Sequence, residues 1–442
     1  MQKMKYSGIE WIGEIPDNWD KIKIKNLCNK IYAGGTPSTD VFEYWDGDIP
    51  WLPSGACHDN IINQANIFIT EKGYKNSSTK LIPKNTTIIA MTGATCANVG
   101  YITFDSCANQ SVTAFVNNHN QLFSKYLFYT LQGAREYILT YQTGGAQAGI
   151  NVENCRNLII PITGIKEQKL IADFLNEKVD TIDNIISDLN NQIEILNKYK
   201  QQLISEVVTK GLNKKVAMKD SEVEWIGSIP EHWNIKLIKN ICSLKGRIGW
   251  EGLTKDEYIS EGPTLITGIN FDNGIINWDS CEHVSEWRYN QDKSIQIKNK
   301  DLLITKDGTI GKVAIVKDCP EKVTLNSGVL LLRPLNNEYI EKYLYYVLLS
   351  NEFWHWFEIE NIGNTTIIHL YQNRFAKFKL ALPSIDEQKE IVNYLDIKCS
   401  EIEEILNSKI KQKEQMEQYK KSVIYEYVTG KKRVEGAEEL YG

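Results

Sequence analysis

The segments "IKEQKLIADFLNEK" (Ile165–Lys178) and "IDEQKEIVNYLDIK" (Ile385–Lys398) are close copies of one another, about 220 positions apart. The same offset relates "YKQQLISEVVTKG" (Tyr199–Gly211) to "YKKSVIYEYVTGK" (Tyr419–Lys431). Similarity at a fixed spacing indicates a duplicated structural unit. The chain is therefore two half-copies that end in the same kind of segment.

The first copy of this segment has the periodicity of a long helix. Apolar residues recur at alternating steps of four and three, with Lys200 filling one place: Ile182, Ile186, Leu189, Ile193, Leu196, Leu203 and Val207. This pattern predicts the seam of a supercoiled helix. The stretch Lys166–Val208 contains no Pro or Gly, so we expect a helix of roughly 40 residues, about 60 Å long at 1.5 Å per residue.

The second copy carries a weaker seam. Its apolar positions are Ile402, Leu406, Met416 and Val423, and Lys409 and Lys413 interrupt them. A lone helix cannot bury such a stripe, whereas two helices of one chain can bury each other's. We therefore predict an antiparallel pair that holds the rest of the chain at a fixed separation. Two separate helices, each packed on its own domain, are the alternative.

A second repeat opens each half. "EWIGEIPDNW" (Glu10–Trp19) returns as "EWIGSIPEHW" (Glu224–Trp233), although tryptophan is a rare residue. We interpret Trp11, Trp19, Trp225 and Trp233 as structural residues that pack the start of each half against the shared framework.

The regions between these repeats read as β-rich bodies of one design. Short apolar strands are predicted at "TTIIAM" (Thr86–Met91) and "DLLITK" (Asp301–Lys306), each followed by a glycine-bearing turn. The predicted fold class is mixed α/β (α+β), with two β-rich globular domains joined by two long antiparallel helices in a coiled coil and an internal pseudo-twofold repeat. The expected segments are 1–165 (first globular domain), 166–217 (central helical spacer), 218–385 (second globular domain) and 386–442 (C-terminal helical spacer and tail).

Composition narrows the class of protein. The chain has 442 residues, 42% of them hydrophobic and 24% charged, which is ordinary for a globular protein. Its formal net charge of −6, taken alone, argues mildly against nucleic acid as a partner. No apolar run is long enough to span a membrane, and no secretory signal opens the sequence. Nine cysteines without a C-x-x-C pair predict reduced thiols and a cytoplasmic location.

Searches for catalytic and metal-binding motifs fail. "KDGTIGKV" (Lys306–Val313) lacks the first glycine of a phosphate-binding loop and has Val313 where Ser or Thr should stand, so a tight turn between strands is the better interpretation. No G-x-S-x-G or H-E-x-x-H motif occurs. Cys57–His58 and Cys281/His283 lack further ligands at zinc-site spacing. We therefore predict no catalytic residue and no metal site, and we favour a binding protein.

Taken together, the twin "EWIGxIPxxW" phrases, the twin "I-x-E-Q-K" helix starts and the duplicated bodies resemble the specificity subunit of a type I restriction–modification system. The likeness covers nearly the whole chain. The second body adds "GRIGWEGLTKDEY" (Gly246–Tyr258) and "KDGTIGK", which resemble segments of the family's target recognition domains.

This resemblance implies a non-catalytic, cytoplasmic subunit. Its two target recognition domains would each read one half of an asymmetric, bipartite double-stranded DNA site. The helices would set the spacing and dock two methyltransferase (modification) subunits, and restriction (motor-nuclease) subunits would join them. The chain would bind no cofactor, because S-adenosylmethionine serves adenine methylation in one kind of partner and ATP and Mg²⁺ serve the other. A repeat scaffold that binds proteins without DNA specificity is the alternative function.

Base reading calls for Arg or Lys against guanine, Asn or Gln against adenine, and adaptable Ser or Thr. Polar loop residues of the two bodies supply the candidates for DNA contact: Thr36, Ser38, Thr92, Gln142 and Gln147 in the first, and Lys245, Arg247, Trp250, Lys306, Thr309, Thr365 and Thr366 in the second.

Overall fold

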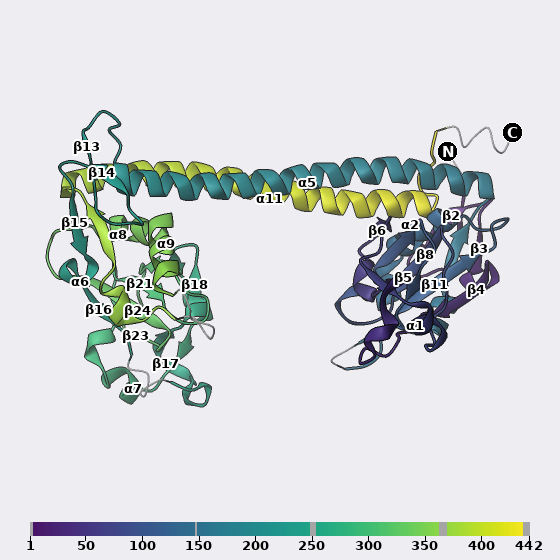
Figure 1. Ribbon diagram of the computed structural model, residues 1–442, viewed down its shortest axis with the longest axis horizontal. Helices are drawn as coiled ribbons and strands as arrows, with labels where there is room; N and C mark the ends of the chain where they lie inside the picture. The colour runs from purple at the N-terminus through teal and green to yellow at the C-terminus, as the bar shows by residue number, and fades with distance from the viewer. Residues whose placement is uncertain (1–2, 146–147, 248–252, 362–368, 436–442) are drawn as a thin grey trace. The chain divides into compact units, whose positions relative to one another are not determined.

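The structure is a computed structural model, and it describes residues 3–145, 148–247, 253–361 and 369–435. The chain divides into two compact units, Met1–Asn190 with Lys411–Gly442 (unit 1) and Asn191–Ile410 (unit 2). Each unit holds one globular body and a stretch of each long helix, α5 (Ile165–Lys210) and α11 (Ile385–Val428) (Figure 1).

The body of unit 1 is built mostly of short strands. They are β1 (Met4–Tyr6), β2 (Glu14–Pro16), β3 (Asp20–Lys23), β4 (Cys28–Ala33), β5 (Trp45–Leu52), β6 (Asn60–Ile62), β7 (Ile67–Ile69), β8 (Thr86–Ala90), β9 (Val99–Ile102), β10 (Cys107–Ala108), β11 (Val112–Asn117) and β12 (Ile159–Ile162). The helices of this body are α1 (Glu71–Lys75), α2 (Ser124–Gly133), α3 (Arg135–Leu139) and α4 (Val152–Asn157).

A five-stranded sheet in the order β4-β11-β8-β9-β6 forms the centre of unit 1. Because side chains alternate across a strand, Ile89 and Phe115 pack under α2, whereas Ile88 and Ala114 face a second core on the other side. The α2 helix lies between this sheet and the long helices (Figure 1), and Tyr126 Oη donates to the Val428 carbonyl of α11 at 3.2 Å. The core of this body therefore includes residues from both long helices.

Unit 2 repeats this plan. Its strands are β13 (Met218–Asp220), β14 (Ser228–Pro230), β15 (Asn234–Leu237), β16 (Cys242–Lys245), β17 (Ile259–Ile266), β18 (Phe271–Asp272), β19 (Ile275–Ile276), β20 (Glu282–His283), β21 (Leu302–Thr305), β22 (Val313–Ile315), β23 (Val323–Leu325), β24 (Val329–Pro334) and β25 (Lys379–Leu382). Its helices are α6 (Ile238–Ile241), α7 (Glu286–Asn290), α8 (Glu341–Leu349), α9 (Asn351–Glu360) and α10 (Gln372–Phe375).

The main sheet of unit 2 has the order β16-β24-β21-β22, which matches β4-β11-β8-β9. Leu302 and Ile304 of β21 share a core with α8, whereas Leu303 packs on the opposite face with Ala314. Tyr343 Oη of α8 donates to the Val208 carbonyl of α5 at 3.1 Å, which mirrors the bond from α2 to α11 in unit 1. The predicted mixed α/β fold with an internal repeat is confirmed.

The long helices run antiparallel. In unit 1, the rings of Phe174 and Tyr427 lie 4.5 Å apart, and Lys420 Nζ bonds Asp183 at 2.7 Å. As the numbering rises along α5, the partner on α11 falls, which defines the direction of pairing. The alternative of two separate helices is wrong.

The burial pattern follows the heptad seam in both units. In unit 2, Lys200 Nζ bonds Glu403 at 2.5 Å, so its aliphatic stem lies over the seam while the charge reaches the partner helix. The structure buries Ile182, Leu189, Leu203, Ile402, Leu406 and Val423, and leaves Ile186, Ile193, Leu196 and Met416 partly buried.

The repeated tryptophan phrase attaches each body to a long helix. Trp19 is 1% exposed, and its indole N–H donates to the buried carboxylate of Glu167 on α5 at 3.1 Å. In unit 2, Trp233 is equally buried, but its indole N–H has no hydrogen-bond partner among the described residues. The matching Glu387 instead contacts His232 Nε2 at 3.1 Å. The copies thus share the packing but not the hydrogen bond.

All nine cysteines are free thiols. Within the described ranges, no group of three or more His, Cys, Asp or Glu side chains is arranged to hold a metal ion. The helices of the described chain also include none with the length and apolar character needed to cross a membrane.

The Trp19–Glu167 bond leads to a stability prediction. Trp19→Phe leaves a buried carboxylate short of one donor, which costs about 1–3 kcal/mol beyond the lost packing. Trp233→Phe is the matched control, because it removes similar volume without breaking such a bond. Urea unfolding followed by circular dichroism should show the larger loss of stability for Trp19→Phe. Equal losses would contradict the assigned role of the hydrogen bond.

Candidate nucleic-acid interface

Three connections meet at one end of the main sheet in unit 1. The chain leaves β4 at Ala33, enters β11 at Val112 and leaves β8 at Ala90, and the strand register places these points side by side. The loops that carry the predicted DNA contacts of this body begin here. The fold therefore brings together candidates that are far apart in the sequence.

The loop after β4 approaches its neighbours too closely for any residue but glycine. A Cβ added to Gly34 would lie 2.0 Å from the Ala108 carbonyl oxygen, and one added to Gly35 would lie 2.4 Å from Ser78 Oγ. This close contact brings Thr36 beside β11, where its hydroxyl bonds the side-chain oxygen of Gln110.

Two further candidates of unit 1 also border this end. The side chain of Ser38 is exposed, while its carbonyl accepts from Trp45 Nε1 at 3.1 Å. Gln142 is partly buried, in the loop after α3. The candidate Gln147 lies outside the described residues.

The turn after β8 is tied to the loop that contains Gln142. Thr92 pairs with Gly149 in an isolated bridge, and Ile150 N–H donates to the Met91 carbonyl at 2.9 Å. Gly93 has φ +67°, a left-handed conformation that glycine adopts without strain. Thr92 therefore lies beside Gly149, which also bridges to Thr143, and these residues form a rim at the end of the sheet.

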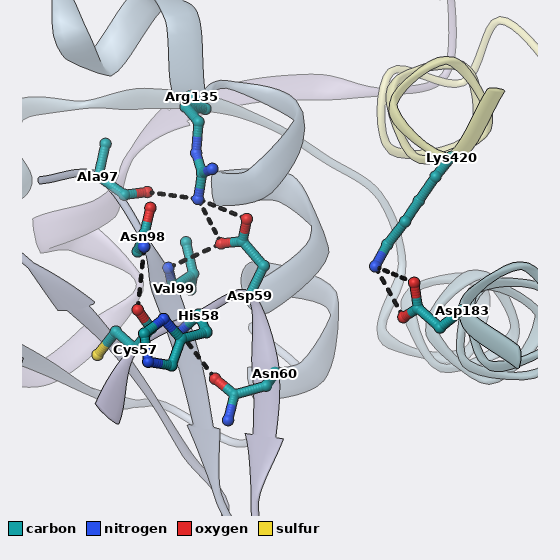
Figure 2. A network of polar contacts seen from close by, with 10 residues as sticks. All are labelled: Cys57, His58, Asp59, Asn60, Ala97, Asn98, Val99, Arg135, Asp183 and Lys420. Carbon is teal, nitrogen blue, oxygen red and sulfur yellow. Dashed lines mark hydrogen bonds and ion pairs between the residues drawn. The ribbon is translucent and has the colours of Figure 1, made fainter. Parts of the chain in front are cut away.

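An ion pair between α3 and the residue just before β6 fixes the turn between β8 and β9 (Figure 2). Arg135 Nη2 at the start of α3 donates to Asp59 Oδ1 at 2.5 Å and to the Ala97 carbonyl at 3.4 Å. Asp59 also accepts from the Val99 backbone N–H at 2.9 Å. Because Ala97 belongs to the turn between β8 and β9, Arg135 positions that turn relative to α3.

Aromatic hydroxyls adjoin the same rim. Tyr137 and Tyr141 lie just before Gln142, and their hydroxyl oxygens are 2.5 Å apart. This hydrogen bond, aided by burial, raises the pKa of Tyr137 to about 12, so its hydroxyl stays protonated and can act as a donor at neutral pH.

Unit 2 has an equivalent end of its sheet. Lys306 stands where Met91 stands in unit 1. The N–H of Met91 donates to Ser111, and the N–H of Lys306 donates to Gly328, both at 2.8 Å. The Lys306 carbonyl accepts from Leu370 N–H at 3.0 Å, as the Met91 carbonyl does from Ile150. The framework is the same, but the side chain differs.

The segment Lys306–Val313 is a turn between the antiparallel strands β21 and β22, as its sequence predicted. Gly308 (φ +71°) and Gly311 (φ +80°) supply the left-handed residues, and Thr305 Oγ1 donates to the Thr309 carbonyl at 2.6 Å. Lys306 is partly buried and Thr309 is exposed. A phosphate-binding loop would instead lead from a strand into a helix.

The remaining candidates of unit 2 have different environments. Lys245 is exposed at the end of β16. Arg247 is 1% exposed, and its guanidinium donates to the Leu325 carbonyl at 2.9 Å and to Thr324 Oγ1 at 3.2 Å. In this structure Arg247 anchors its loop on the strand β23. Trp250, Thr365 and Thr366 lie outside the described residues.

Two polar groups at these ends are absent from the sequence-based set. Gln110 is exposed immediately before β11 and contacts Thr36. His369 Nδ1 bonds Asp307 beside Lys306. In the sequence, "NQSVTAF" (Asn109–Phe115) aligns with "NSGVLLL" (Asn326–Leu332). This alignment marks the start of β11 and of β24 and would have identified Gln110 as a loop residue. The partner of His369 is not evident from sequence.

The chemistry of these ends suits binding. Hydroxyl, amide and ammonium groups can donate to or accept from base edges and phosphates. Cys57, two residues before Asp59, is a poor nucleophile, because burial raises its pKa to about 12, which disfavours the reactive thiolate.

Comparisons with known proteins place this geometry in a family. The family model described as "Type I restriction modification DNA specificity domain" matches residues 16–195 and 230–412. The MjaVIII specificity subunit of Methanocaldococcus jannaschii is 24% identical over 424 residues, which cover 95% of this chain and 94% of the relative. The EcoR124I/EcoR124II specificity subunit of Escherichia coli is 32% identical over 176 residues, which cover 38% and 43%.

A solved structure has the same fold. It comes from work described as "Structural basis underlying complex assembly and conformational transition of the type I R-M system", with a TM-score of 0.71 and 14% identity, and it covers 94% of this chain and 99% of its own. The two family-model matches account for most of the sequence, one in each half. The chain therefore belongs to the type I restriction modification DNA specificity family, and it is a specificity subunit, which recognises DNA and is not itself catalytic.

Proposed function

We propose that each body reads one half of an asymmetric, bipartite double-stranded DNA site, and that the paired helices set the spacing of the half-sites. The single observation that carries this proposal is the equivalence of Met91 and Lys306. Both residues make the same backbone contacts at the same end of the sheet, yet they present different side chains. Two identical readers would require a palindromic site, whereas one framework with two sets of loop residues suits two different half-sites.

In this proposal, loop side chains at the two sheet ends contact the DNA. The candidates in the first domain are Thr36, Ser38, Thr92, Gln142 and Gln147, and those in the second are Lys245, Trp250, Lys306, Thr309, Thr365 and Thr366, with Arg247 supporting its loop from inside. The proposed domains are 1–165 and 218–385, with helical spacers at 166–217 and 386–442.

We further propose that the helices dock two methyltransferase subunits on equivalent surfaces. Ile185 and Tyr419 in unit 1 are 42% and 53% exposed, and Ile405 and Tyr199 in unit 2 are 46% and 53% exposed. Ile405 is the repeat counterpart of Ile185, and Tyr419 that of Tyr199. Each of the four residues precedes a seam position, so in an antiparallel pair the isoleucine and tyrosine of each unit flank the seam on the same side.

This duplicated Ile–Tyr surface suits two copies of one partner. The methyltransferase partners would supply S-adenosylmethionine for adenine methylation. Restriction (motor-nuclease) subunits that use ATP and Mg²⁺ would join them in the cytoplasm, where the chromosomal DNA is accessible.

Exchanging one body tests whether each body reads its own half-site independently. We expect that replacing Lys21–Ile165 with the corresponding segment of another family member changes the first half-site only, because the loops of each body read separately. The methylated motif, determined by sequencing that detects modified adenines, is the measurement. A reciprocal exchange of Trp233–Ile385 is the control. A change in both half-sites would contradict independent reading.

Lys306 is the sharpest single-residue test of base reading. Lys306→Gln should weaken discrimination at one position of the second half-site by about 1–3 kcal/mol. Binding competition among duplexes with single-base changes measures this effect. Lys317→Gln is the matched control, because Lys317 is exposed just beyond the other end of β22. If both variants discriminate equally well among these duplexes, Lys306 does not read a base.

Introducing a charge at the Ile–Tyr surfaces tests docking. We expect Ile185→Glu to reduce the number of bound methyltransferase subunits from two to one. The double variant Ile185→Glu/Ile405→Glu should bind none. In each case an apolar contact worth about 1.5–3 kcal/mol becomes a buried charge. Ile195→Glu is the control, because Ile195 is 64% exposed but its repeat counterpart is Gln415. Mass measurement by light scattering reports the stoichiometry. Two bound subunits in the double variant would refute this docking surface.

A further inference from the structure

A basic groove lies beside the strand β4 in unit 1. Its cavity of about 650 Å³ is lined by Lys25, Lys30, Lys80 and Arg156, together with the rings of Tyr32 and Tyr74. β4 is the last strand of the five-stranded sheet on this side. The groove therefore follows a sheet edge that carries cations and aromatic rings.

The lining of this groove is basic, and one of its cations, Arg156, is paired with Glu153 just outside the lining at 3.8 Å. The lining side chains within the described chain include four cations and no carboxylate. The four cationic residues are exposed, although the whole chain has a net charge of −6. A cluster of exposed cations of this kind attracts a polyanion locally, whatever the net charge of the whole chain.

The Tyr32 ring helps to fix the position of a lysine in the groove. Lys80 Nζ lies 5.3 Å from the centroid of the Tyr32 ring, and Tyr32 Oη donates to the Leu81 carbonyl at 2.7 Å. Burial, with smaller effects from Cys107 and Tyr74, raises the pKa of Tyr32 to about 12, so this hydroxyl keeps its proton and its bond. Lys80 is thus held over the edge strand.

The groove leads to the end of the sheet that carries the candidate reading loops. Lys30 and Thr36 are six positions apart along a chain that leaves β4 at Ala33. Extended backbone covers up to about 20 Å over that length at 3.3 Å per residue, which corresponds to about six base pairs at 3.4 Å each. One duplex can therefore span both features.

The edge strand β16 of unit 2 also carries an exposed lysine, Lys245, but the rest of this edge is arranged differently. The same strand places Leu244, only 9% exposed, in this region, and Gln372 Nε2 donates to the Leu244 carbonyl at 2.9 Å. The corresponding edge is therefore partly covered by α10. The difference indicates that the lysines of unit 1 are not a requirement of the shared fold.

We infer that this groove binds the phosphodiester backbone of DNA within about six base pairs of the half-site read by the first domain. The inference rests on the proposed function, because it takes the nearby sheet end as the base-reading surface. Lys30 and Lys80 neutralise phosphates and Lys25 and Arg156 extend the track, which adds affinity without sequence preference. The competing interpretation is that these lysines only protect an edge strand from pairing with other chains.

The test compares the double variant Lys30→Gln/Lys80→Gln with Lys84→Gln, in the complex of the full chain with its methyltransferase partner. Lys84 is exposed just before β8, two strands away from β4 in the same sheet, and it does not line the groove. The probe is a duplex that carries the motif methylated in the host genome. Binding is measured by fluorescence anisotropy between 50 and 200 mM salt, and circular dichroism checks that both variants are folded.

Loss of two phosphate contacts lowers the slope of log K against log salt by about 1.8. The wild-type complex should then weaken about twelvefold more than the double variant over this fourfold salt range. Lys84→Gln should match the wild type. An unchanged slope in the double variant would overturn the inference and favour edge protection.

Neutral methylphosphonate linkages locate the contact. Substituting them singly along the duplex should weaken wild-type binding at one or two positions near the first half-site and leave the double variant insensitive there. Equal sensitivity of both proteins at every linkage would overturn the inference. If the wild-type complex shows no preference for the motif-bearing duplex over a scrambled one, the proposed function itself fails, which is a distinguishable result.

Discussion

The apolar seam shared by α5 and α11 is the constraint on which the rest of the structure depends. Neither helix can bury its stripe alone, and each stripe is divided between the two units. In unit 1, Ile171 and Leu175 of α5 join Val423 of α11 in the main core of the body. In unit 2, Leu203 of α5 joins Leu395 of α11 in the same way. Each body is therefore completed by helices that come from both halves of the sequence.

The duplication preserved framework contacts and allowed the loops to diverge. Tyr126 and Tyr343 both bond a long helix through their hydroxyls, and Trp19 and Trp233 are both buried. Residues that bond through backbone groups tolerate replacement of their side chains, as the change from Met91 to Lys306 illustrates. This combination of a constant frame with variable loops is the physical basis on which one fold can serve many DNA sequences.

Much of the fold was predictable from sequence because its signals are periodic and local. The seam spacing predicted α5 and α11, and apolar runs predicted β8 and β21. The candidate site was less predictable. Arg135 and Asp59 are far apart in the chain, and only the folded structure pairs them. Arg247 has the residue type expected of a guanine reader, yet its guanidinium points inward to β23, because residue type alone does not specify the direction of a side chain.

The last turns of α11 and Val434 complete a core that belongs mainly to the first body. Val423, Ile424, Val428 and Val434 contribute to the main core of unit 1, whose other residues come mostly from the first third of the sequence. On the ribosome, this core cannot close until synthesis has reached Val434. We therefore expect the nascent first half to need protection during translation, and premature termination to damage the domain made first.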